Sequence, residues 1–368
     1  MSWQATLTAA WLRRGRLATV LRPLAFVYGW LWRRRWQRAQ PATPLDIPVV
    51  VVGNVIAGGA GKTPFTHAVA QLFLGEGRHV GIISKGYGRQ STNPQPLLVQ
   101  AETDPAQCGD EPLWLARSLA CPVVVGPDRQ ASIRALRAAH PEVDLILCDD
   151  GLQDLQLHRD LELVVFDERV CGNGWLLPAG PLREPWPRPK ARPLQAEVWV
   201  IHSTTRAPVG PDGHAPAVAA PPVEVPDAPG PLWHVERSLE PLARSLDGQR
   251  THPLSDWCDQ PVQVLTGIAK PEQLLNMLRA LGLRIEHSVV RPDHDPLTGA
   301  EYALRPELPV LVTAKDAVKL KRLGAQWQQR LWVAELTLSL PEGLQSALRH
   351  WAHQPTAELS SRHGQKIA

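Results

Sequence analysis

The sequence predicts an α/β protein in which a parallel sheet is flanked by helices and is followed by a second, smaller α/β lobe. From residue 47 onward, apolar β-rich runs alternate with helical patterns, and a proline-rich stretch divides this alternation in two. A chain of 368 residues is long enough for two hydrophobic cores. The predicted segments are an N-terminal segment at 1–45, a core at 46–206, a linker or loop at 207–232, a second lobe at 233–355 and a disordered tail at 356–368.

The strands are predicted from short apolar runs bounded by turn residues. Because these runs are apolar throughout, both faces of the sheet should be buried under helices. First-lobe strands are expected at Val49–Val52, His79–Ser84, Pro122–Val125, Val143–Cys148, Leu161–Phe166 and Glu197–Ile201. In the second lobe, strands are expected at Val262–Leu265, Arg284–Val290, Val310–Thr313 and Leu331–Glu335, with helices at Glu272–Leu281 and Gly343–Trp351.

The N-terminal segment is strongly basic. Residues 1–40 contain eight arginines and no acidic residue, although the net charge of the whole chain is only +3. Trp30, Trp32 and Trp36 interleave with these arginines, which is typical of a helix in the headgroup layer of a membrane. Spanning a bilayer takes ~20 apolar residues, and Pro23 interrupts the run, so we expect a membrane-associated helix that does not cross. A cleavable signal peptide fits poorly, and a surface-docked helix or a nucleic-acid-binding segment are the alternatives.

A glycine-rich loop joins the first predicted strand to a helix, within GNVIAGGAGKTPF. Binding a triphosphate takes several backbone N–H groups, a helix N-terminus, a lysine and a hydroxyl for Mg²⁺. The glycines let the loop curl, although Ile56 stands where the usual motif has its first glycine. The sequence therefore predicts a variant phosphate loop in a P-loop NTPase-like sheet. Its nucleotide contacts are expected from Gly58, Gly59, Ala60, Gly61, Lys62 and Thr63.

Acidic residues follow another buried run. Asp149 and Asp150 come directly after Val143–Cys148, where a P-loop enzyme needs a carboxylate for its metal ion or the waters around it. An ordinary strand-ending turn is the alternative interpretation. The loop and these acids together favour a metal-assisted reaction on a nucleotide.

Two further polar motifs are ambiguous by themselves. Asp110 and Glu111 begin an apolar helix, where acids commonly cap the helix and complement its dipole. His294 lies between Asp293 and Asp295, and flanking acids can fix the tautomer of a histidine and raise its pKa, which suits a general base. An ordinary surface loop is the alternative for the second motif.

The ordered motifs together resemble the tetraacyldisaccharide 4'-kinases, the lipid A 4'-kinases of Gram-negative bacteria. The resemblance covers nearly the whole chain and is carried by GNVIAGGAGKTP, SKGYGR, GDEPLWLA, DDGLQD, LPAGPLREP, LTGIAKPEQL, RPDHDPLTGAEY and VTAKDAVKL. It implies transfer of the γ-phosphate of ATP to the 4'-hydroxyl of tetraacyldisaccharide 1-phosphate in lipid A biosynthesis. It also implies attachment to the cytoplasmic face of the inner membrane, with a lipid substrate. No nucleic-acid partner is expected, and the resemblance implies no protein partner.

The resemblance implies roles for the matching residues. Lys62 and Thr63 would hold the β- and γ-phosphates of ATP and the Mg²⁺ ion. Asp110 and His294 would pair across the cleft and take the proton from the sugar hydroxyl, which is a poor nucleophile without a base. Asp149, Asp150 and Glu184 would form the acidic metal cluster, and the hydroxyl of Thr63 would be a further metal contact.

Some positions and some function classes remain open. Asp154 and Ala314 depart from the family pattern, and the sequence assigns no role to Lys315 or Asp316. A regulatory P-loop ATPase or metallochaperone and a membrane-associated nucleotide-binding scaffold are the alternative functions. A metallochaperone should carry a His/Cys-rich tract, which this chain lacks. The five cysteines form no C-x-x-C pair, so we expect reduced thiols and no zinc site.

Overall fold

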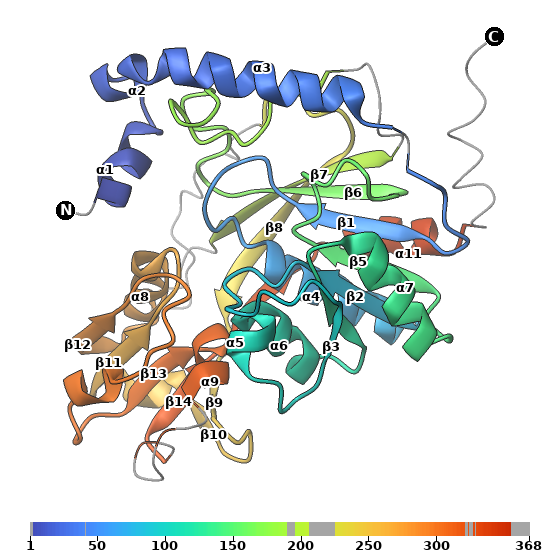
Figure 1. Ribbon diagram of the computed structural model, residues 1–368. Coiled ribbons are helices and arrows are strands. Elements are labelled where there is room, and N and C mark those ends of the chain that lie inside the picture. Colours follow the sequence, from blue (N-terminus) through green and yellow to red (C-terminus); the bar gives the residue numbers. More distant parts are fainter. Residues whose placement is uncertain are drawn as a thin grey trace.

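The structure is a computed structural model in which two sheets form the cores of two lobes (Figure 1). It describes residues 3–40, 42–189, 196–205, 225–320, 323, 327 and 329–354. The predicted tail at 356–368 and residues 207–224 of the predicted linker lie outside the described residues.

The larger lobe is built on a nine-stranded sheet with the order β15-β8-β7-β6-β1-β5-β2-β4-β3. Neighbouring strands from β8 to β4 are parallel, and an antiparallel strand, β15 or β3, closes each edge. The predicted parallel sheet is therefore confirmed, and every predicted first-lobe strand is present with small shifts at its ends. The strands are β1 Val49–Gly53, β2 Val80–Ser84, β3 Leu97–Val99, β4 Val123–Val125, β5 Leu145–Asp149, β6 Leu161–Phe166, β7 Glu197–Thr205, β8 Leu232–Leu239 and β15 Leu336–Ser339.

Helices cover both faces of this sheet, because its central strands are apolar on both sides. On one face, Phe65 of α4, Leu113 of α6 and Trp351 of α11 belong to one buried cluster. On the other face, Ile133 and Leu136 of α7 belong to a second cluster, which takes the alternate residues of β1. The helices of this lobe are α4 Lys62–Gly75, α5 Pro105–Cys108, α6 Asp110–Ser118, α7 Arg129–Ala139 and α11 Glu342–Ala352.

The smaller lobe has a six-stranded sheet with the order β10-β9-β14-β13-β11-β12. The strands from β14 to β12 pair in parallel, whereas β9 pairs antiparallel with both β14 and β10. The strands are β9 Leu242–Ser245, β10 Thr251–Pro253, β11 Pro261–Thr266, β12 Arg284–Val290, β13 Val310–Thr313 and β14 Leu331–Ala334. The helices are α8 Pro271–Ala280, α9 Ala314–Leu320 and the short 3-10 turns η1 Leu254–Trp257 and η2 Ala300–Ala303.

The smaller lobe is inserted between two neighbouring strands of the larger sheet. β8 and β15 pair antiparallel, with Leu239 opposite Leu336, so the chain leaves and re-enters the larger lobe at adjacent points. Between the two crossings, the amide of Glu240 donates to the carbonyl oxygen of Glu335 at 2.9 Å. The predicted second lobe at 233–355 differs from this arrangement at both ends, because β8, β15 and α11 belong to the larger lobe.

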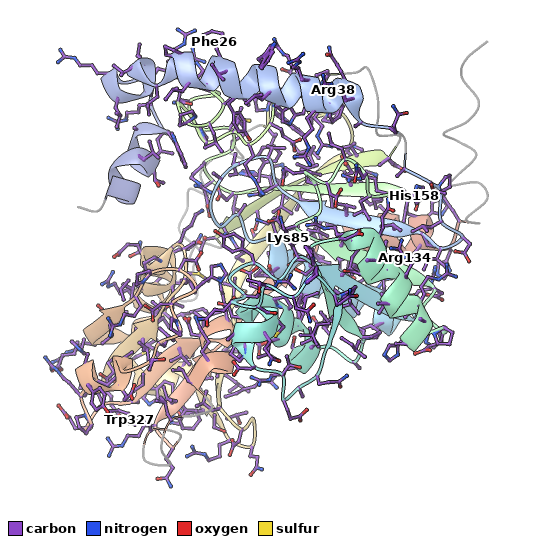
Figure 2. All side chains as sticks on the ribbon, in the orientation of Figure 1. Phe26, Arg38, Lys85, Arg134, His158 and Trp327 are labelled. Atoms are coloured by element: carbon purple, nitrogen blue, oxygen red, sulfur yellow. The ribbon has the colours of Figure 1, made fainter. Side chains whose placement is uncertain are left out.

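In the described residues before the larger sheet, the structure has three helices: α1 Trp3–Ala10, α2 Arg16–Val20 and α3 Arg22–Arg38. α3 contacts the larger lobe through a face that includes buried Ala25 and Trp36, and the hydroxyl of Tyr28 donates to the carbonyl oxygen of Arg183 at 2.6 Å. Phe26 is 68% exposed and lies on the side of α3 that faces away from the lobe (Figure 2). Within the described residues, we find no helix with the length and apolar character needed to cross a membrane.

Candidate active site

The phosphate loop follows β1 at the carboxyl edge of the larger sheet. β1 lies between β5 and β6, and Val52 of β1 is opposite Asp149 of β5, so the loop and the acidic strand end are neighbours. Ligand sites of parallel sheets form at this edge. The two motifs that the sequence predicts to act together are therefore adjacent.

The loop has the backbone conformation that its glycines allow. Gly58 (φ 90°) and Gly61 (φ 81°) lie in the left-handed region, which side chains disfavour. α4 begins at Lys62, so the unpaired N–H groups of its first turn follow the loop directly. A Cβ atom on Gly59 would lie 3.2 Å from the Cβ of Ala269 in the smaller lobe. The phosphate loop, which belongs to the larger lobe, therefore also lies close to the smaller lobe.

Ile56, at the position of the missing glycine, is fully buried and pairs with the segment LPAGPLREP. Its backbone forms an isolated antiparallel bridge with Leu182, and the amide of Ala57 donates to the carbonyl oxygen of Pro181 at 2.7 Å. The chain is therefore held by a neighbouring segment where the usual motif begins with glycine. The tight curl starts two residues later, at Gly58.

The hydroxyl of Thr63 lies between two carboxylates. Its Oγ1 is 3.1 Å from Oδ2 of Asp149 and 3.1 Å from Oε2 of Glu111, while the hydroxyl of Thr66 donates to Oδ1 of Asp149 at 2.8 Å. Burial, together with the negative charges of Glu111 and Asp150, raises the pKa of Asp149 to about 7. Because the Thr63 hydroxyl has one proton, it can donate to only one of its two carboxylates. Asp149 and Glu111 therefore compete for the one proton that Thr63 can donate.

Asp150 has cationic partners. Its Oδ2 lies 3.8 Å from Nζ of Lys62, and its Oδ1 lies 3.2 Å from a guanidinium nitrogen of Arg183. Burial opposes the ionisation of Asp150, but the positive charges of Lys62 and Arg183 hold its pKa below the ordinary value. Asp150 therefore contacts the lysine that is predicted to hold phosphate.

Glu184, which the family resemblance places in the metal cluster, has other partners in the structure. Its buried carboxylate accepts hydrogen bonds from Arg188 at 3.0 and 3.2 Å and from Gln153 at 3.2 Å. No group of three or more His, Cys, Asp or Glu side chains among the described residues is arranged to hold a metal ion. The acid that lies beside Thr63 and Asp149 is Glu111, which sequence reasoning treated as a helix cap.

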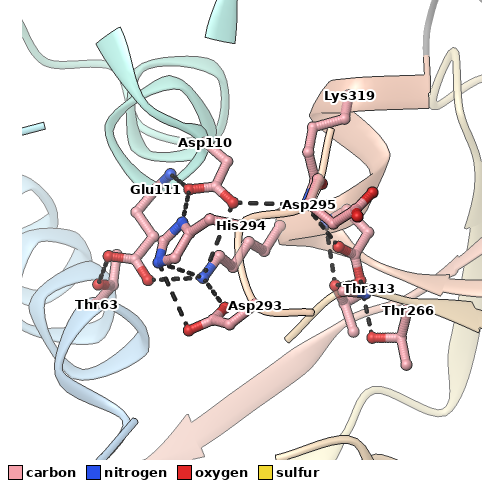
Figure 3. A network of polar contacts seen from close by, with 12 residues as sticks. Thr63, Asp110, Glu111, Thr266, Asp293, His294, Asp295, Thr313 and Lys319 are labelled. Atoms are coloured by element: carbon pink, nitrogen blue, oxygen red, sulfur yellow. Dashed lines mark hydrogen bonds and ion pairs between the residues drawn. The ribbon is translucent and has the colours of Figure 1, made fainter. Parts of the chain in front are cut away.

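Asp110 and His294 come together from the two lobes (Figure 3). Nδ1 of His294 lies 2.8 Å from Oδ1 of Asp110, the first residue of α6. Gly88 packs closely on the ring, since a Cβ atom there would lie 3.0 Å from Nδ1. Burial lowers the pKa of His294, but the hydrogen bond and the negative charge of Asp110 raise it overall. The predicted pair is thus in contact, and its catalytic role stays a prediction.

Lys315 and Asp316, to which the sequence assigns no role, lie beside this pair at the start of α9. Nζ of Lys315 is 3.1 Å from Oε1 of Glu111 and 2.9 Å from Oδ1 of Asp293, so this lysine bridges the lobes. The carboxylate of Asp316 accepts hydrogen bonds at the end of β11, from the hydroxyl of Thr266 at 2.9 Å and from the amide of Gly267 at 3.2 Å. The carbonyl oxygen of Gly267 in turn accepts from the amide of His294 at 3.3 Å. The motif VTAKD is the sequence signal for both residues, but their contacts cross between distant segments.

Two cavities adjoin these residues. One, of about 200 Å³, is lined by Gly61, Thr63, Glu111 and Lys315, so residues of both lobes face it together with the phosphate loop. The other, of about 570 Å³, is lined by residues that include Asp110 and His294. A ligand in the first cavity would meet the phosphate loop, and a ligand in the second would meet the Asp–His pair.

Comparisons with known proteins find relatives over most of this chain. The LpxK family model, described as tetraacyldisaccharide-1-P 4'-kinase, matches residues 17–353. A tetraacyldisaccharide 4'-kinase of Delftia acidovorans is 40% identical over 343 residues, covering 91% of this chain and 91% of the relative. A relative of the same name from Polaromonas naphthalenivorans is 39% identical and covers 97% of this chain and 98% of its own length.

A solved structure shares the fold. The crystal structure of LpxK from Aquifex aeolicus in complex with ATP has a TM-score of 0.69 and 23% sequence identity, and the match covers 92% of this chain and 100% of that chain. The family model and the curated relatives extend over most of the sequence, including every motif of the site. This chain therefore belongs to the family of tetraacyldisaccharide-1-P 4'-kinases.

Proposed function

We propose that this protein transfers the γ-phosphate of ATP to the 4'-hydroxyl of tetraacyldisaccharide 1-phosphate, with Asp110 and His294 as the general-base pair. The observation that carries this proposal is the 2.8 Å contact between Nδ1 of His294 and Oδ1 of Asp110, which joins the two lobes next to the phosphate loop. Family membership supports the substrate and the reaction class.

The phosphate loop fits the triphosphate of ATP. The left-handed glycines Gly58 and Gly61 allow its N–H groups to turn into one concavity, and the N-terminus of α4 favours a negative charge. Gly59 leaves room that a Cβ atom would fill, 3.2 Å from Ala269. Lys62 adds a positive charge, whose position Asp150 supports from 3.8 Å.

Thr63 and Asp149 fit a divalent cation, with Glu111 beside them in place of Glu184. All three offer oxygen atoms, which Mg²⁺ prefers, and burial together with the negative charges of Glu111 and Asp150 raises the pKa of Asp149. When bound, Mg²⁺ neutralises charge on the phosphates during transfer. Asp150, which the sequence also places in the metal cluster, acts in this proposal through Lys62.

His294 supplies the base. Because Nδ1 faces the carboxylate of Asp110, the ring proton resides there, and Nε2 keeps the lone pair that takes the proton from the sugar hydroxyl. The carboxylate then stabilises the imidazolium that forms. Asp110 belongs to the larger lobe and His294 to the smaller one, so the pair is complete only while the lobes are in contact.

The exposed face of α3 supports attachment to a membrane surface, where the acylated substrate resides. Phe26, Trp30 and Leu31 are each more than half exposed, and the guanidinium of Arg34 lies 4.5 Å from the centre of the Trp30 ring. Apolar and aromatic side chains next to arginines suit the interface of an anionic bilayer. We place the protein peripherally on the cytoplasmic face of the inner membrane, where ATP is available.

The test is an assay with labelled ATP and purified tetraacyldisaccharide 1-phosphate. His294→Ala and Asp110→Ala should each lower phosphate transfer by at least ~10²-fold, because each removes general-base catalysis. Binding of an ATP analogue should survive in both variants, since neither residue belongs to the phosphate loop. If the wild type transfers no phosphate, the chain acts as a nucleotide-binding scaffold; unchanged turnover in both variants would refute the base assignment.

A further inference from the structure

The ammonium group of Lys315 is held by three acceptors where the lobes meet. Its Nζ lies 2.9 Å from Oδ1 of Asp293, 3.1 Å from Oε1 of Glu111 and 3.4 Å from Nε2 of His294. A lysine has three N–H donors, so each acceptor can receive one hydrogen bond. Burial opposes the charge of this side chain, but the surrounding carboxylates, Glu111 first, raise the pKa of Lys315 and keep it charged.

The contact with Nε2 constrains the imidazole. An ammonium group can only donate, so in this contact Nε2 accepts with its lone pair. The ring proton then lies on Nδ1, where it is donated to Oδ1 of Asp110 at 2.8 Å. This is the state that a general base requires, since the lone pair that takes up a proton is on the nitrogen away from the carboxylate.

The other neighbours of His294 favour the opposite state. Asp110 contacts Nδ1, and Oδ2 of Asp293 lies 3.6 Å from Nε2. Two carboxylates beside one imidazole stabilise the imidazolium, which has no lone pair to offer to a hydroxyl proton. The positive charge of Lys315 opposes both carboxylates and acts directly at Nε2.

We propose that Lys315 is a positioning residue that keeps Nε2 of His294 unprotonated, and that Glu111 of the larger lobe holds the ammonium in place for this task. Glu111 also contacts the hydroxyl of Thr63 in the phosphate loop. The base is therefore prepared only when the lobes are together and the loop is next to them. The inference deepens the proposed function and rests on it for its catalytic meaning.

Lys319 offers a matched control on the same helix. It lies about one turn after Lys315, with its Nζ 3.5 Å from Oδ2 of Asp110 and 3.0 Å from the carbonyl oxygen of Asp295. Lys319 thus places a positive charge next to Asp110, on the side of the Asp110–His294 pair away from Nε2. Within the described part of the chain, the titratable groups that contact the His294 ring are Asp110 of α6, Tyr87 of the SKGYGR segment, Asp293 of its own loop and Lys315 of α9. Glu111 and Lys319 lie behind them.

The first test follows the ring of His294 by NMR titration in the full-length protein. Lys315→Met should lower the acid dissociation constant of the His294 imidazolium by roughly tenfold, because a positive charge near Nε2 is lost. In Lys315→Arg, the pKa of His294 should stay near its wild-type value. In Lys319→Met, the pKa of His294 should shift by less than half of its shift in Lys315→Met. Equal changes in the two methionine variants, or none in Lys315→Met, would overturn the proposal.

The second test measures phosphate transfer as a function of pH. The turnover of Lys315→Met should be about tenfold or more below that of the wild type near neutral pH. Most of it should return in alkaline buffer, where Nε2 of His294 loses its proton even without the positive charge of Lys315. A loss that alkaline pH does not reverse would overturn the proposal, because a structural defect has no reason to follow this titration. If the wild type transfers no phosphate, the proposed function fails, while the NMR titration still decides whether Lys315 controls Nε2.

Discussion

The contact between Asp110 and His294 makes the pH dependence of transfer predictable. A general base works in its neutral form, so turnover should fall as the pH drops through the pKa of His294. Burial lowers that pKa, but the hydrogen bond and the charge of Asp110 raise it overall. In Asp110→Asn this raising influence is lost, so the acidic limb of the kcat/KM profile should move to lower pH. The maximal rate should fall by ~10²–10⁴-fold, because the imidazolium loses its carboxylate.

Profiles of kcat/KM against pH, measured for the wild type and Asp110→Asn, check both expectations. Asp293→Asn serves as a comparison, because Asp293 lies 3.6 Å from Nε2 and contacts the other side of the ring. An acidic limb that stays at the same pH in Asp110→Asn would mean that His294 does not set it.

Asp154 departs from the family pattern, and a contact with a buried arginine explains the presence of an aspartate at this position. Its Oδ2 lies 3.2 Å from Arg129, whose side chain is 9% exposed and which also donates to the carbonyl oxygen of Asp150 at 2.6 Å. Asp154→Ala should lower the free energy of unfolding by about 1–3 kcal/mol, because the guanidinium is left without its carboxylate. The exposed pair of Asp46 and Arg137 is the control, and Asp46→Ala should cost no more than about 1 kcal/mol. Urea unfolding measures both; equal losses would contradict this account.

Sequence reasoning finds site residues where the chemistry is local and misses them where it depends on distant contacts. The phosphate loop and Asp149 could be predicted because a strand, a loop and a helix follow one another. Asp110 and His294 are 184 residues apart, and only the family resemblance paired them. Glu111 has the pattern of a helix cap, and its place beside Thr63 follows from the packing of α6 against the loop.

Among the elements, the entry to the phosphate loop has a structure that the usual motif does not suggest. Ile56 is fully buried and pairs with Leu182, so its side chain contributes to the core. Ile56→Gly would restore the usual motif, yet it should lower the free energy of unfolding by about 3–5 kcal/mol, because it leaves a cavity. Ile56→Val should cost only about 0.5–1.5 kcal/mol. We expect no gain in nucleotide affinity from the glycine.

Denaturant unfolding and equilibrium binding of an ATP analogue check this prediction. Tighter nucleotide binding by Ile56→Gly without a loss of stability would contradict this account, because it would show that the isoleucine only weakens nucleotide binding by the loop. The expected result would show that the segment around Leu182 replaces the first glycine.

The strands divide into those that the sequence predicts and those that it does not. Strands such as β1 and β6 are buried at every residue and read as apolar runs. β3, β9, β10 and β15 have only three or four residues and are partly exposed, so they give no clear run. β8 is longer, but its alternating exposure breaks the apolar pattern. The strands that the sequence does not predict are therefore the short antiparallel strands at or next to the sheet edges and the half-exposed strand β8.

For the whole molecule, the insertion of the smaller lobe is the feature that sequence patterns could not reveal. The antiparallel pairing of β8 with β15 joins segments on either side of the entire smaller lobe, and a linear pattern does not encode such a contact. The insertion also explains how the site is divided. Asp110 and Glu111 belong to the larger lobe, and His294 and Lys315 belong to the smaller one, so the adjacent crossings at Glu240 and Glu335 keep the two halves in reach of each other.

The proposed membrane attachment rests on the outer face of α3. Phe26, Trp30 and Leu31 are 68%, 52% and 54% exposed, whereas the opposite face of the helix packs on the larger lobe. Replacing all three by serine should weaken binding to anionic lipid vesicles by more than tenfold, because each apolar side chain contributes about 1.5–3 kcal/mol when it leaves water. Nucleotide binding should be unchanged, since these residues lie outside the phosphate loop.

Vesicle sedimentation with phosphatidylglycerol measures this loss. The control is Tyr302→Ser, which removes an aromatic side chain that is 89% exposed on the smaller lobe and should leave vesicle binding intact. If the triple variant still sediments with vesicles as the wild type does, the lipid contact lies on another surface. If Tyr302→Ser weakens vesicle binding equally, exposed aromatic side chains promote vesicle binding wherever they lie on the protein, and α3 has no special role. Loss in the triple variant alone would assign the membrane contact to α3, because its arginines remain and only the apolar face has changed.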